Sequence, residues 1–506
     1  MSPEQPADST AGRERPPRAR GGNGLALVAG PLLASVAYLL TGGAEAALEP
    51  PGRATAAVAV WMAAWWLTEA VPLAATAMLP LCLFPLLGVA TAEQAAAPYA
   101  NSLVFLFLGG FLIGLGMQRW GLHRRMALLV LRAAGSDTRR LVGAFMLVSA
   151  LLSMWISNTA TAIMLLPIAT SLLASIDASA ASDRRADVSA DGAIGSALLL
   201  GIAYSSSIGG AATLIGTPPN LVLAAFLRER YDIDLGMLDW LAVGLPFALL
   251  MLPCAWLYLT RVACRDMPRS LPGSRALFVE QLHALGPWSR GERTAALVFA
   301  SAVLAWMSRP FLVQLTGLHG LTDAVIAMSA GLALFAIPVD YPSRIYAMDW
   351  ATARRLPWDI LLLFGGGLTL ADAIARHGVD AWLASAVIGL AGMPMVIVVL
   401  GVAALVVFLT EVTSNTAVAA TLLPVIAATA VALQVDPSPL LVATALAASC
   451  AFMLPVATPP NAIVFSAGHV TIAQMARAGI VLNLVSILTI TALMGLGLGS
   501  GLLSRP

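Results

Sequence analysis

The sequence predicts an all-α polytopic membrane protein, organised as a secondary transporter from two related halves. Apolar residues make up 59% of its 506 residues and charged residues only 11%, whereas soluble domains have about 45–50% and about 25%. Many apolar segments approach or exceed the roughly 20 residues that a helix needs to cross a bilayer. Two polar, helix-breaking motifs also occur twice along the chain. Such repeated breaks inside apolar segments are typical of secondary transporters with a central binding site.

The beginning of the chain is expected to be a disordered cytoplasmic segment. Residues 1–22 are rich in Pro, Arg and Gly, a composition that does not bury a core. Four arginines between positions 13 and 20 precede the first apolar span, and basic residues beside a first helix keep that end cytoplasmic. We therefore expect an uncleaved first helix in the cell inner (plasma) membrane, with the N-terminus inside.

Apolar segments of membrane-spanning length follow along the rest of the chain and predict about 11 transmembrane helices. The candidate spans are 25–41, 54–72, 73–90, 141–174, 194–228, 236–262, 294–315, 320–338, 382–393, 396–434, 439–470 and 478–500. The expected organisation is a scaffold at 23–97, a first repeat at 98–235, scaffold helices with a cytoplasmic linker at 236–355, a second repeat at 356–475, and a last helix at 476–506.

Two further apolar stretches have glycines at their centres. Residues 98–120 contain Gly109-Gly110, and residues 356–377 contain Gly365-Gly366-Gly367, at the same separation of 257 residues. They are either ordinary helices loosened by glycine or re-entrant hairpins that enter and leave on one side of the membrane. Non-helical backbone at that depth occurs only where protein or a water-filled cavity covers it, and the glycines alone favour neither interpretation.

Two polar motifs are shared by the halves. Ser157-Asn158-Thr159 returns 257 residues later as Ser414-Asn415-Thr416. Thr217-Pro218-Pro219-Asn220 returns 241 residues later as Thr458-Pro459-Pro460-Asn461. The first half thus carries 16 extra residues, which we place in the polar loop around Asp177 to Asp191.

The distribution of arginine predicts that the two halves are inverted relative to each other. Residues 119–140 contain six arginines, whereas the equivalent window 376–397 contains one. Short Arg-rich loops stay cytoplasmic, so the two halves are expected to face opposite sides, as alternating access by inverted repeats requires. The Arg-rich loop 261–293, which joins the halves, is expected to be cytoplasmic too. The segment from His123 to Arg140 is either an amphipathic interfacial helix or a plain charged loop.

The chemistry of the two motifs predicts binding sites for ions. Ser, Asn and Thr favour turns and caps over helix interiors, and paired prolines remove backbone donors and disfavour helix before them. A helix broken there has free carbonyls on one side and free N–H groups on the other. Carbonyl and side-chain oxygens suit a hard monovalent cation, and helix N-termini suit an anion. The alternative, that these residues only join helices, is weaker for two motifs in register.

The motifs resemble those of the divalent anion/sodium symporter family, of the dicarboxylate/citrate transporter type. The resemblance extends over nearly the whole membrane region. The matching residues are Trp66-Leu67-Thr68-Glu69-Ala70-Val71-Pro72, Leu108-Gly109-Gly110-Phe111, the two Ser-Asn-Thr triplets, Gly216-Thr217-Pro218-Pro219-Asn220 and Ala457-Thr458-Pro459-Pro460-Asn461.

The resemblance implies a homodimer, in which a transport domain moves against a scaffold domain as an elevator. It also implies two re-entrant hairpins, which favours that interpretation of the Gly-rich stretches. One sodium (Na+) site would use Ser153, Ser157, Asn158 and the backbone at Gly216, and the other would use Thr410, Thr413, Asn415 and the backbone at Ala457. The carboxylate substrate would contact Asn158, Thr159, Thr217, Asn415, Thr416, Thr458 and Pro459.

Charge balance makes this arrangement physically coherent. Neither motif contains Arg or Lys, so bound cations and helix N-termini must offset the charge of a dianion at membrane depth. Cation binding then becomes a precondition for substrate binding, which is coupling. Glu69 and Glu411 are additional candidates, because ionisable groups within membranes are often functional. Glu411 could tune a cation site or carry a proton, but we favour a structural carboxyl that holds a broken helix.

The leading functional hypothesis is sodium-driven uptake of a small di- or tricarboxylate such as succinate, malate or fumarate. Alternatives within the same family are sulfate transport and sodium-independent exchange of dicarboxylates. An ion channel, with the Gly-rich stretches as pore loops, belongs to a different class and fits two non-identical segments less well. The sequence contains no HExxH motif and no paired catalytic aspartates in facing spans, so it gives no support to an intramembrane enzyme. The net charge of +1 gives no reason to expect a nucleic-acid partner.

Overall fold

The computed structural model describes residues 24–43, 48–182, 188–271, 273–382 and 393–499. Eight helices among these residues are long and apolar enough to cross a membrane, and shorter apolar helices accompany them. A two-stranded antiparallel hairpin, β1 (Pro338–Asp340) and β2 (Ile345–Tyr346), is a minor addition. The prediction of an all-α polytopic fold is confirmed. Residues 1–22 and nearly all of the candidate span 382–393 lie outside the described residues.

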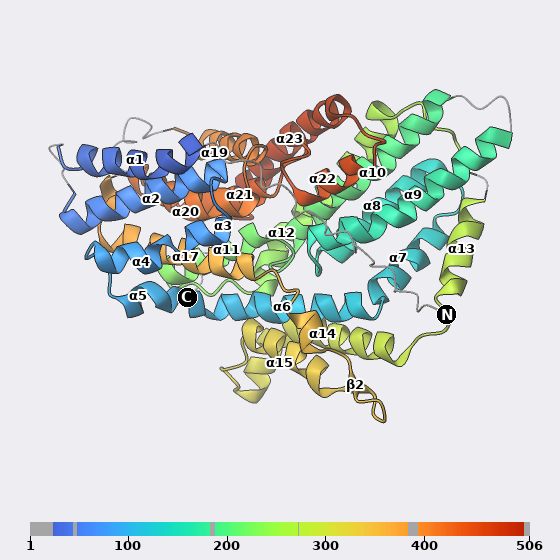
Figure 1. The fold of residues 1–506 in the computed structure, drawn as a ribbon. Coiled ribbons are helices and arrows are strands. Elements are labelled where there is room, and N and C mark those ends of the chain that lie inside the picture. The colour runs from blue at the N-terminus through green and yellow to red at the C-terminus, as the bar shows by residue number, and fades with distance from the viewer. Residues whose placement is uncertain (1–23, 44–47, 183–187, 272, 383–392, 500–506) are drawn as a thin grey trace, which may run out of the picture.

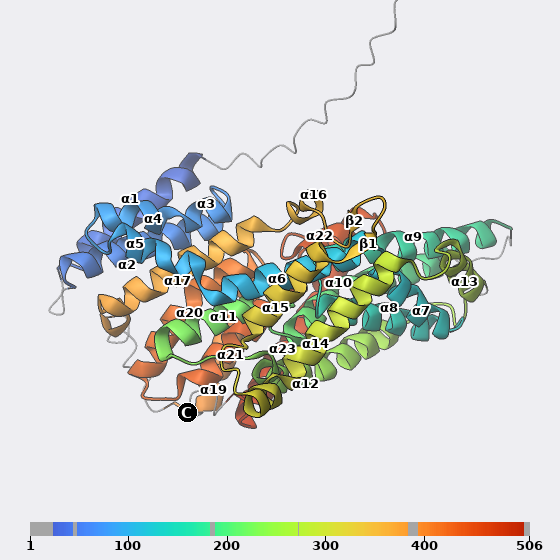
Figure 2. The ribbon, with the colours of Figure 1, turned by 90° about the horizontal axis from the view of Figure 1, so that it is seen from below.

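One group of helices comes from the start and the middle of the chain. It consists of α1 (Gly24–Leu40), α2 (Pro50–Thr68), α3 (Leu73–Ala77), α4 (Leu79–Leu86), α5 (Ala92–Ala96), the 3-10 helix η1 (Ala97–Ala100), α6 (Ser102–Arg119), α14 (Arg290–Thr316), α15 (Asp323–Ala336), α16 (Trp350–Ala353) and α17 (Trp358–Arg376). Figure 2 shows α6, α15 and α14 side by side on the face turned to the viewer. Helix α17 packs against α3 and η1.

The second group carries both pairs of motifs. It consists of α8 (Thr138–Ser153), α9 (Asn158–Ser182), α10 (Val188–Ala212), α11 (Pro218–Tyr231), α12 (Met237–Tyr258), α19 (Met395–Thr410), α20 (Asn415–Ala432), α21 (Pro437–Ala448), α22 (Pro459–Ser466) and α23 (Ile472–Gly495). Helix α10 packs against α8, α9 and α12, and α21 packs against α19 and α20. A single π-helical turn, η2 (Leu259–Ala263), continues α12.

The Arg-rich segment after α6 forms a helix rather than a charged loop. Helix α7 (Leu122–Ala133) buries Leu128 and Leu131 on one face and exposes Arg124 and Arg132 on the other. The prediction of an amphipathic helix is therefore confirmed for residues 122–133, and its position at a membrane interface stays a prediction. It packs against α13 (Ser274–Ala284), which lies within the linker between the halves. Figure 1 shows α7 and α13 together at one end of the molecule.

The Gly-rich stretches are not hairpins. Helices α6 and α17 each run through their glycines without a break, as the alternative of ordinary helices predicted. The glycines serve close packing instead: Gly109 lies against the backbone of Ala327 in α15, and Gly366 against the carbonyl of Ala77 in α3. Small residues allow such close approach between helices. The expectation that these stretches are re-entrant hairpins is therefore wrong.

Helical hairpins occur at the Ser-Asn-Thr triplets instead. The predicted span 141–174 is divided into α8 and α9, and 396–434 into α19 and α20, with a triplet in each turn. Figure 1 shows α8 and α9 side by side in its right half, and α19 with α20 in its left half. The Thr-Pro-Pro-Asn motifs divide the next spans in the same way, into α10 and α11 and into α21 and α22.

The extra residues of the first half lengthen helices. Helices α9 and α10 have 25 residues each, whereas their counterparts α20 and α21 have 18 and 12. The prediction of a polar loop from Asp177 to Asp191 is wrong for most of that segment, because α9 continues to Ser182 and α10 begins at Val188. Figure 1 shows both helices extending beyond the rest of the bundle.

Candidate functional site

Two asparagines organise the broken helices in the same way. The Asn220 side-chain amide donates to the carbonyls of Gly210 (3.4 Å), Ala211 (3.3 Å) and Thr213 (2.8 Å). The Asn461 amide donates to the carbonyls of Ala451 (3.1 Å) and Leu454 (3.0 Å). Both side chains are fully buried, and these bonds replace those that the unwound backbone lacks.

The first triplet forms a capped turn between α8 and α9. The Ser153 hydroxyl donates to Asn158 Oδ1, and the Ser157 hydroxyl accepts from the backbone N–H of Ala160 at 3.2 Å. Serine is a preferred residue at this position before a helix, because its oxygen satisfies a free N–H group. Asn158 and Thr159 are half-buried in the first turn of α9, so polar groups remain accessible beside a buried core.

A glycine of α10 brings two predicted ligands of the first sodium site together. A methyl group built on Gly210 would lie 2.5 Å from Asn158 Oδ1 and 3.1 Å from the carbonyl oxygen of Gly216. Both oxygens therefore line the space beside the Gly210 Cα. The neighbouring Gly209 lies against the backbone of Ala150 in α8, which explains how α10 approaches the hairpin so closely.

The second triplet repeats this geometry, with Thr410 at the position that corresponds to Ser153. The Thr410 hydroxyl contacts Asn415 Oδ1 at 2.7 Å and the carbonyl of Ala448 at 3.0 Å. Thr413 donates to the carbonyl of Leu409 at 2.9 Å. Thr410, Thr413 and the predicted backbone ligand Ala457 are all buried. Thr410 and Asn415 thus bring two neutral side-chain oxygens together, of the kind that a hard cation prefers.

The halves pack crosswise. Helix α9, which begins at the first triplet, contacts α22, which begins at the second Thr-Pro-Pro-Asn motif. Helix α20, which begins at the second triplet, contacts α11, which begins at the first Thr-Pro-Pro-Asn motif. The ring of Tyr204 in α10 also packs edge-on against Phe452, 5.3 Å between centroids, in the segment that joins α21 and α22.

Each of the four helices in this crosswise packing begins at a residue of one of the motifs. Thr217 and Thr458 are the residues before α11 and α22, and both are buried. Thr458 also accepts from the N–H of Asn461 at 3.3 Å. Thr416 is half-buried in the first turn of α20, and Pro459 is exposed at the start of α22. Free N–H groups and the positive ends of helix dipoles favour an anion at such positions.

The two predicted tuning residues lie in different surroundings. Glu69 ends α2 in a left-handed conformation (φ 48°) and is exposed, on an element outside the four motif turns. Glu411 follows Thr410 at the end of α19 and is only 3% exposed. Its carboxylate contacts the segment between α21 and α22, next to the second predicted sodium site.

Sequence reasoning missed three residues that build this site. Gly210 provides the space beside Asn158, and the indole of Trp240 in α12 donates to the carbonyl of Ala211 at 3.0 Å. Asn483 in α23 donates to Glu411 at 2.7 Å. Adjacent glycines near a predicted break, and single Asn or Trp residues within apolar spans, were the signals available in the sequence.

Comparison with known proteins identifies the family. Residues 31–503 match the model of the sodium:sulfate symporter transmembrane region. The chain is 38% identical over 466 residues to the sodium-dependent dicarboxylate transporter SdcS of Staphylococcus saprophyticus, covering 92% of this chain and 89% of the relative. It is 37% identical over 469 residues to the protein of the same name from Staphylococcus aureus, with the same coverage.

The chain belongs to the sodium:sulfate symporter family. The resemblance noted in the motifs is therefore confirmed, and membership of a transporter family supports a multi-pass membrane protein that is not an enzyme. Among solved structures, the Alcanivorax borkumensis YdaH transporter matches with a TM-score of 0.54 at 16% identity, over 90% of this chain and 100% of that one. At that identity the match describes the fold alone.

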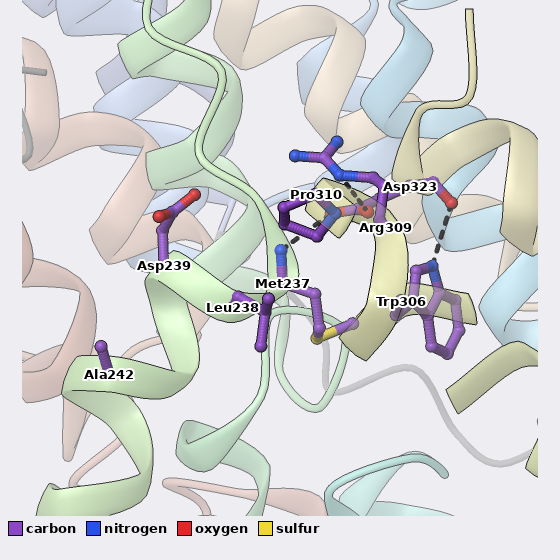
Figure 3. A pocket seen from close by; sticks show the side chains of 8 residues that line it. All are labelled: Met237, Leu238, Asp239, Ala242, Trp306, Arg309, Pro310 and Asp323. Carbon is purple, nitrogen blue, oxygen red and sulfur yellow. Dashed lines mark hydrogen bonds and ion pairs between the residues drawn. The ribbon is translucent and has the colours of Figure 1, made fainter. Parts of the chain in front are cut away.

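This member of the symporter family also has a cavity whose lining contains none of the motif residues. It has a volume of about 340 Å³ and is lined by Met237, Leu238, Asp239, Ala242, Trp306, Arg309, Pro310 and Asp323. Figure 3 shows Arg309 and Asp323 side by side on one side of it, with Arg309 Nε 3.2 Å from Asp323 Oδ1. Asp323 Oδ2 also accepts from the N–H of Met237 at 2.8 Å. Because its arginine is already paired, this cavity is a weaker candidate for an anion than the motif turns.

Proposed function

We propose that the protein is a sodium-coupled symporter that imports small di- or tricarboxylates of the succinate, malate or fumarate type. The observation that carries the proposal is the crosswise packing of the four motif-bearing helices, α9 with α22 and α11 with α20. It brings helices that begin at the motifs of one half into contact with helices that begin at the motifs of the other, and we infer that their N-termini and neutral oxygens share one site. The printed names of the two Staphylococcus relatives, sodium-dependent dicarboxylate transporters, support the same cargo.

The two sodium sites are proposed at the two triplet turns. Ser153, Ser157, Asn158 and the Gly216 carbonyl would bind the first ion, and Thr410, Thr413, Asn415 and the Ala457 carbonyl the second. The hydrogen bonds of Ser153 to Asn158 and of Thr410 to Asn415 hold each set of oxygens together. A bound ion would replace these internal contacts with ion–oxygen contacts, which is favourable for a hard cation.

The carboxylate is proposed to lie between the two ions, near Asn158, Thr159, Thr217, Asn415, Thr416, Thr458 and Pro459. These segments contain no Arg or Lys, so a dianion there would keep its charge uncompensated unless cations bind as well. Substrate affinity then depends on sodium, and by linkage sodium affinity depends on substrate. This electrostatic requirement supports symport over sodium-independent exchange.

Movement is proposed to follow an elevator scheme with inverted repeats in a homodimer. The group that contains α8 to α12 and α19 to α23 would be the transport domain, and the group that contains α6, α14, α15 and α17 the scaffold. Helix α14 buries only 17% of its most apolar window, so it has a large face for lipid or a second copy. The triplet hairpins would be the re-entrant ones, with the N-terminus cytoplasmic in the inner membrane.

Uptake by the purified protein in liposomes tests this proposal. Radiolabelled succinate should accumulate when an inward sodium gradient is imposed and should fall to background when potassium or choline replaces sodium. Unlabelled sulfate in excess should leave succinate uptake unchanged, whereas competition by sulfate would favour the cargo in the printed family description. Succinate uptake that does not depend on sodium would refute the symport proposal.

A further inference from the structure

A buried carboxylate distinguishes the second half of the protein from the first. Glu411 is 3% exposed and directly follows Thr410. The equivalent residue of the first half, 257 positions earlier, is Met154, which directly follows Ser153. A charged group that is retained in the interior needs compensating partners, because its desolvation is costly.

The partners of Glu411 are all hydrogen-bond donors. Its Oε1 accepts from the backbone N–H groups of Phe452 (2.7 Å) and Met453 (2.9 Å) and from the side-chain amide of Asn483 (2.7 Å). Its Oε2 accepts from the N–H of Leu454 at 3.1 Å. Four N–H donors point at the two oxygens, and hydrogen bonds to an ionised acceptor are the stronger ones, so the arrangement favours the ionised carboxylate. The geometry therefore argues against a proton carrier.

These bonds connect the two parts of the second sodium site. Phe452, Met453 and Leu454 lie in the segment between α21 and α22, and Ala457 follows three residues later. Asn461 holds the same segment from its carbonyl side, at Ala451 and Leu454. The segment is thus fixed from both sides, to its own helix by Asn461 and to the α19–α20 hairpin by Glu411.

The first half makes the corresponding connection differently. There the Thr213 hydroxyl donates to the carbonyl of Met154, and Asn220 and Trp240 hold the neighbouring carbonyls. This connection between loop and hairpin uses a neutral group. Charge-assisted hydrogen bonds are roughly twice as strong as neutral ones, so the second loop is held more tightly than the first.

We propose that Glu411 is a positioning residue for the second sodium site. Its carboxylate fixes residues 452–454 to the hairpin that carries Thr410 and Asn415, and so holds the Ala457 carbonyl in place for the ion. Its negative charge, one residue from Thr410, also favours a cation there. The inference rests on the proposed function for its sodium site, but the attachment of the loop can be measured without transport.

Hydrogen exchange, followed by mass spectrometry on the purified full-length protein, tests the attachment. The variants are Glu411→Gln, which keeps the shape, and Glu411→Met, which installs the residue of the first half. Amides of Phe452, Met453 and Leu454 should exchange at least about tenfold faster in both variants, because loss of a hydrogen-bonded anchor increases local opening. Exchange in residues 211–217, the equivalent loop, should not change and serves as the internal control.

Sodium titration of succinate uptake tests the consequence for the ion. The sodium concentration that gives half-maximal uptake should rise roughly tenfold in Glu411→Gln, while uptake at saturating sodium recovers most of its wild-type rate. Asn483→Leu, which removes one donor to the carboxylate, should give a smaller shift in the same direction. Thr213→Val is the matched variant in the first half and should leave exchange in residues 452–454 unchanged.

Two outcomes would overturn the inference. One is wild-type exchange of residues 452–454 in both Glu411 variants. The other is a lower maximal uptake with no change in the sodium titration, which is the expected result for a merely structural residue. If wild-type uptake ignored sodium, the proposed function would fail, and the exchange measurement would still decide whether Glu411 holds the loop.

Discussion

Asn220 and Asn461 hold equivalent loops in the two halves, each through carbonyls seven and ten residues before it. Because the separations are identical, both broken helices have the same hydrogen-bond pattern. The hairpin contacts are also equivalent, since Ser153 and Asn158, like Thr410 and Asn415, are five residues apart. The structure therefore contains two copies of one unit.

Removing either triplet asparagine should abolish sodium-coupled uptake. Asn158→Ala and Asn415→Ala each delete an amide oxygen at a proposed ion site and the partner of Ser153 or Thr410. Uptake of labelled succinate under a sodium gradient should fall to background in both, while yield and elution volume of the purified protein stay as in wild type. Normal transport by either variant would show that the site is assigned wrongly.

A methyl group at Gly210 should damage the first site only. The built Cβ lies 2.5 Å from Asn158 Oδ1, so Gly210→Ala must displace that side chain. Helix propensity favours alanine by roughly 1 kcal/mol, so an effect on sodium cannot come from a weaker helix. We expect the half-maximal sodium concentration to rise about tenfold or more. The control is Gly192→Ala in the same helix, where a Cβ meets nothing within 4 Å; equal shifts in both would contradict the prediction.

Close packing at Gly109 should make α6 intolerant of a side chain. A Cβ there would overlap the backbone of Ala327 in α15, and overpacking typically costs about 1–3 kcal/mol. Gly109→Ala should lower the melting temperature of the detergent-purified protein. Gly401→Ala in α19, where a Cβ meets nothing within 4 Å, should leave the melting temperature unchanged or raise it. An unaltered Gly109→Ala melting temperature would mean that α6 and α15 separate easily.

The buried ion pair of Arg125 and Glu292 should be strongly coupled. Arg125 in α7 contacts Glu292 in α14 through two bonds, of 2.8 Å and 3.2 Å, and both residues are 5% exposed. Arg125→Met or Glu292→Leu alone should destabilise the protein by about 3–5 kcal/mol, because each leaves an unpaired buried charge. The double variant should recover much of that loss in thermal unfolding. Additive losses in the double variant would rule out the coupling.

Much of the fold could be predicted from composition and from helix-breaking residues. Apolar segments located the helices, and the triplets and Thr-Pro-Pro-Asn motifs located the breaks, because Ser, Asn, Thr and Pro disfavour helix interiors for local reasons. The Gly-rich stretches could not be interpreted locally. Glycine permits a turn, but it also permits close helix contact, and only the positions of Ala77 and Ala327 show that packing was its role here.

The oxygen atoms of the candidate site could be predicted from the sequence, but the residues that hold them in place could not. Asn158 and Asn415 lie within repeated motifs, so repetition alone marks them. The supporting residues act on parts of the chain far away in sequence. Trp240 and Asn483 donate to groups 29 and 72 positions away, and Gly210 leaves room for the side chain of Asn158. The residue types mark these positions as unusual, but the partners of such long-range contacts cannot be predicted from the neighbouring sequence. Glu411 could be singled out as a buried charge, but its three backbone partners required the fold.

The most direct test of the central claim is a density map of the protein determined with sodium and succinate present. Succinate should lie between the turns of Asn158 and Asn415, with an ion beside each asparagine. Succinate in the cavity at Arg309, shown in Figure 3, with no density between the two turns, would contradict it.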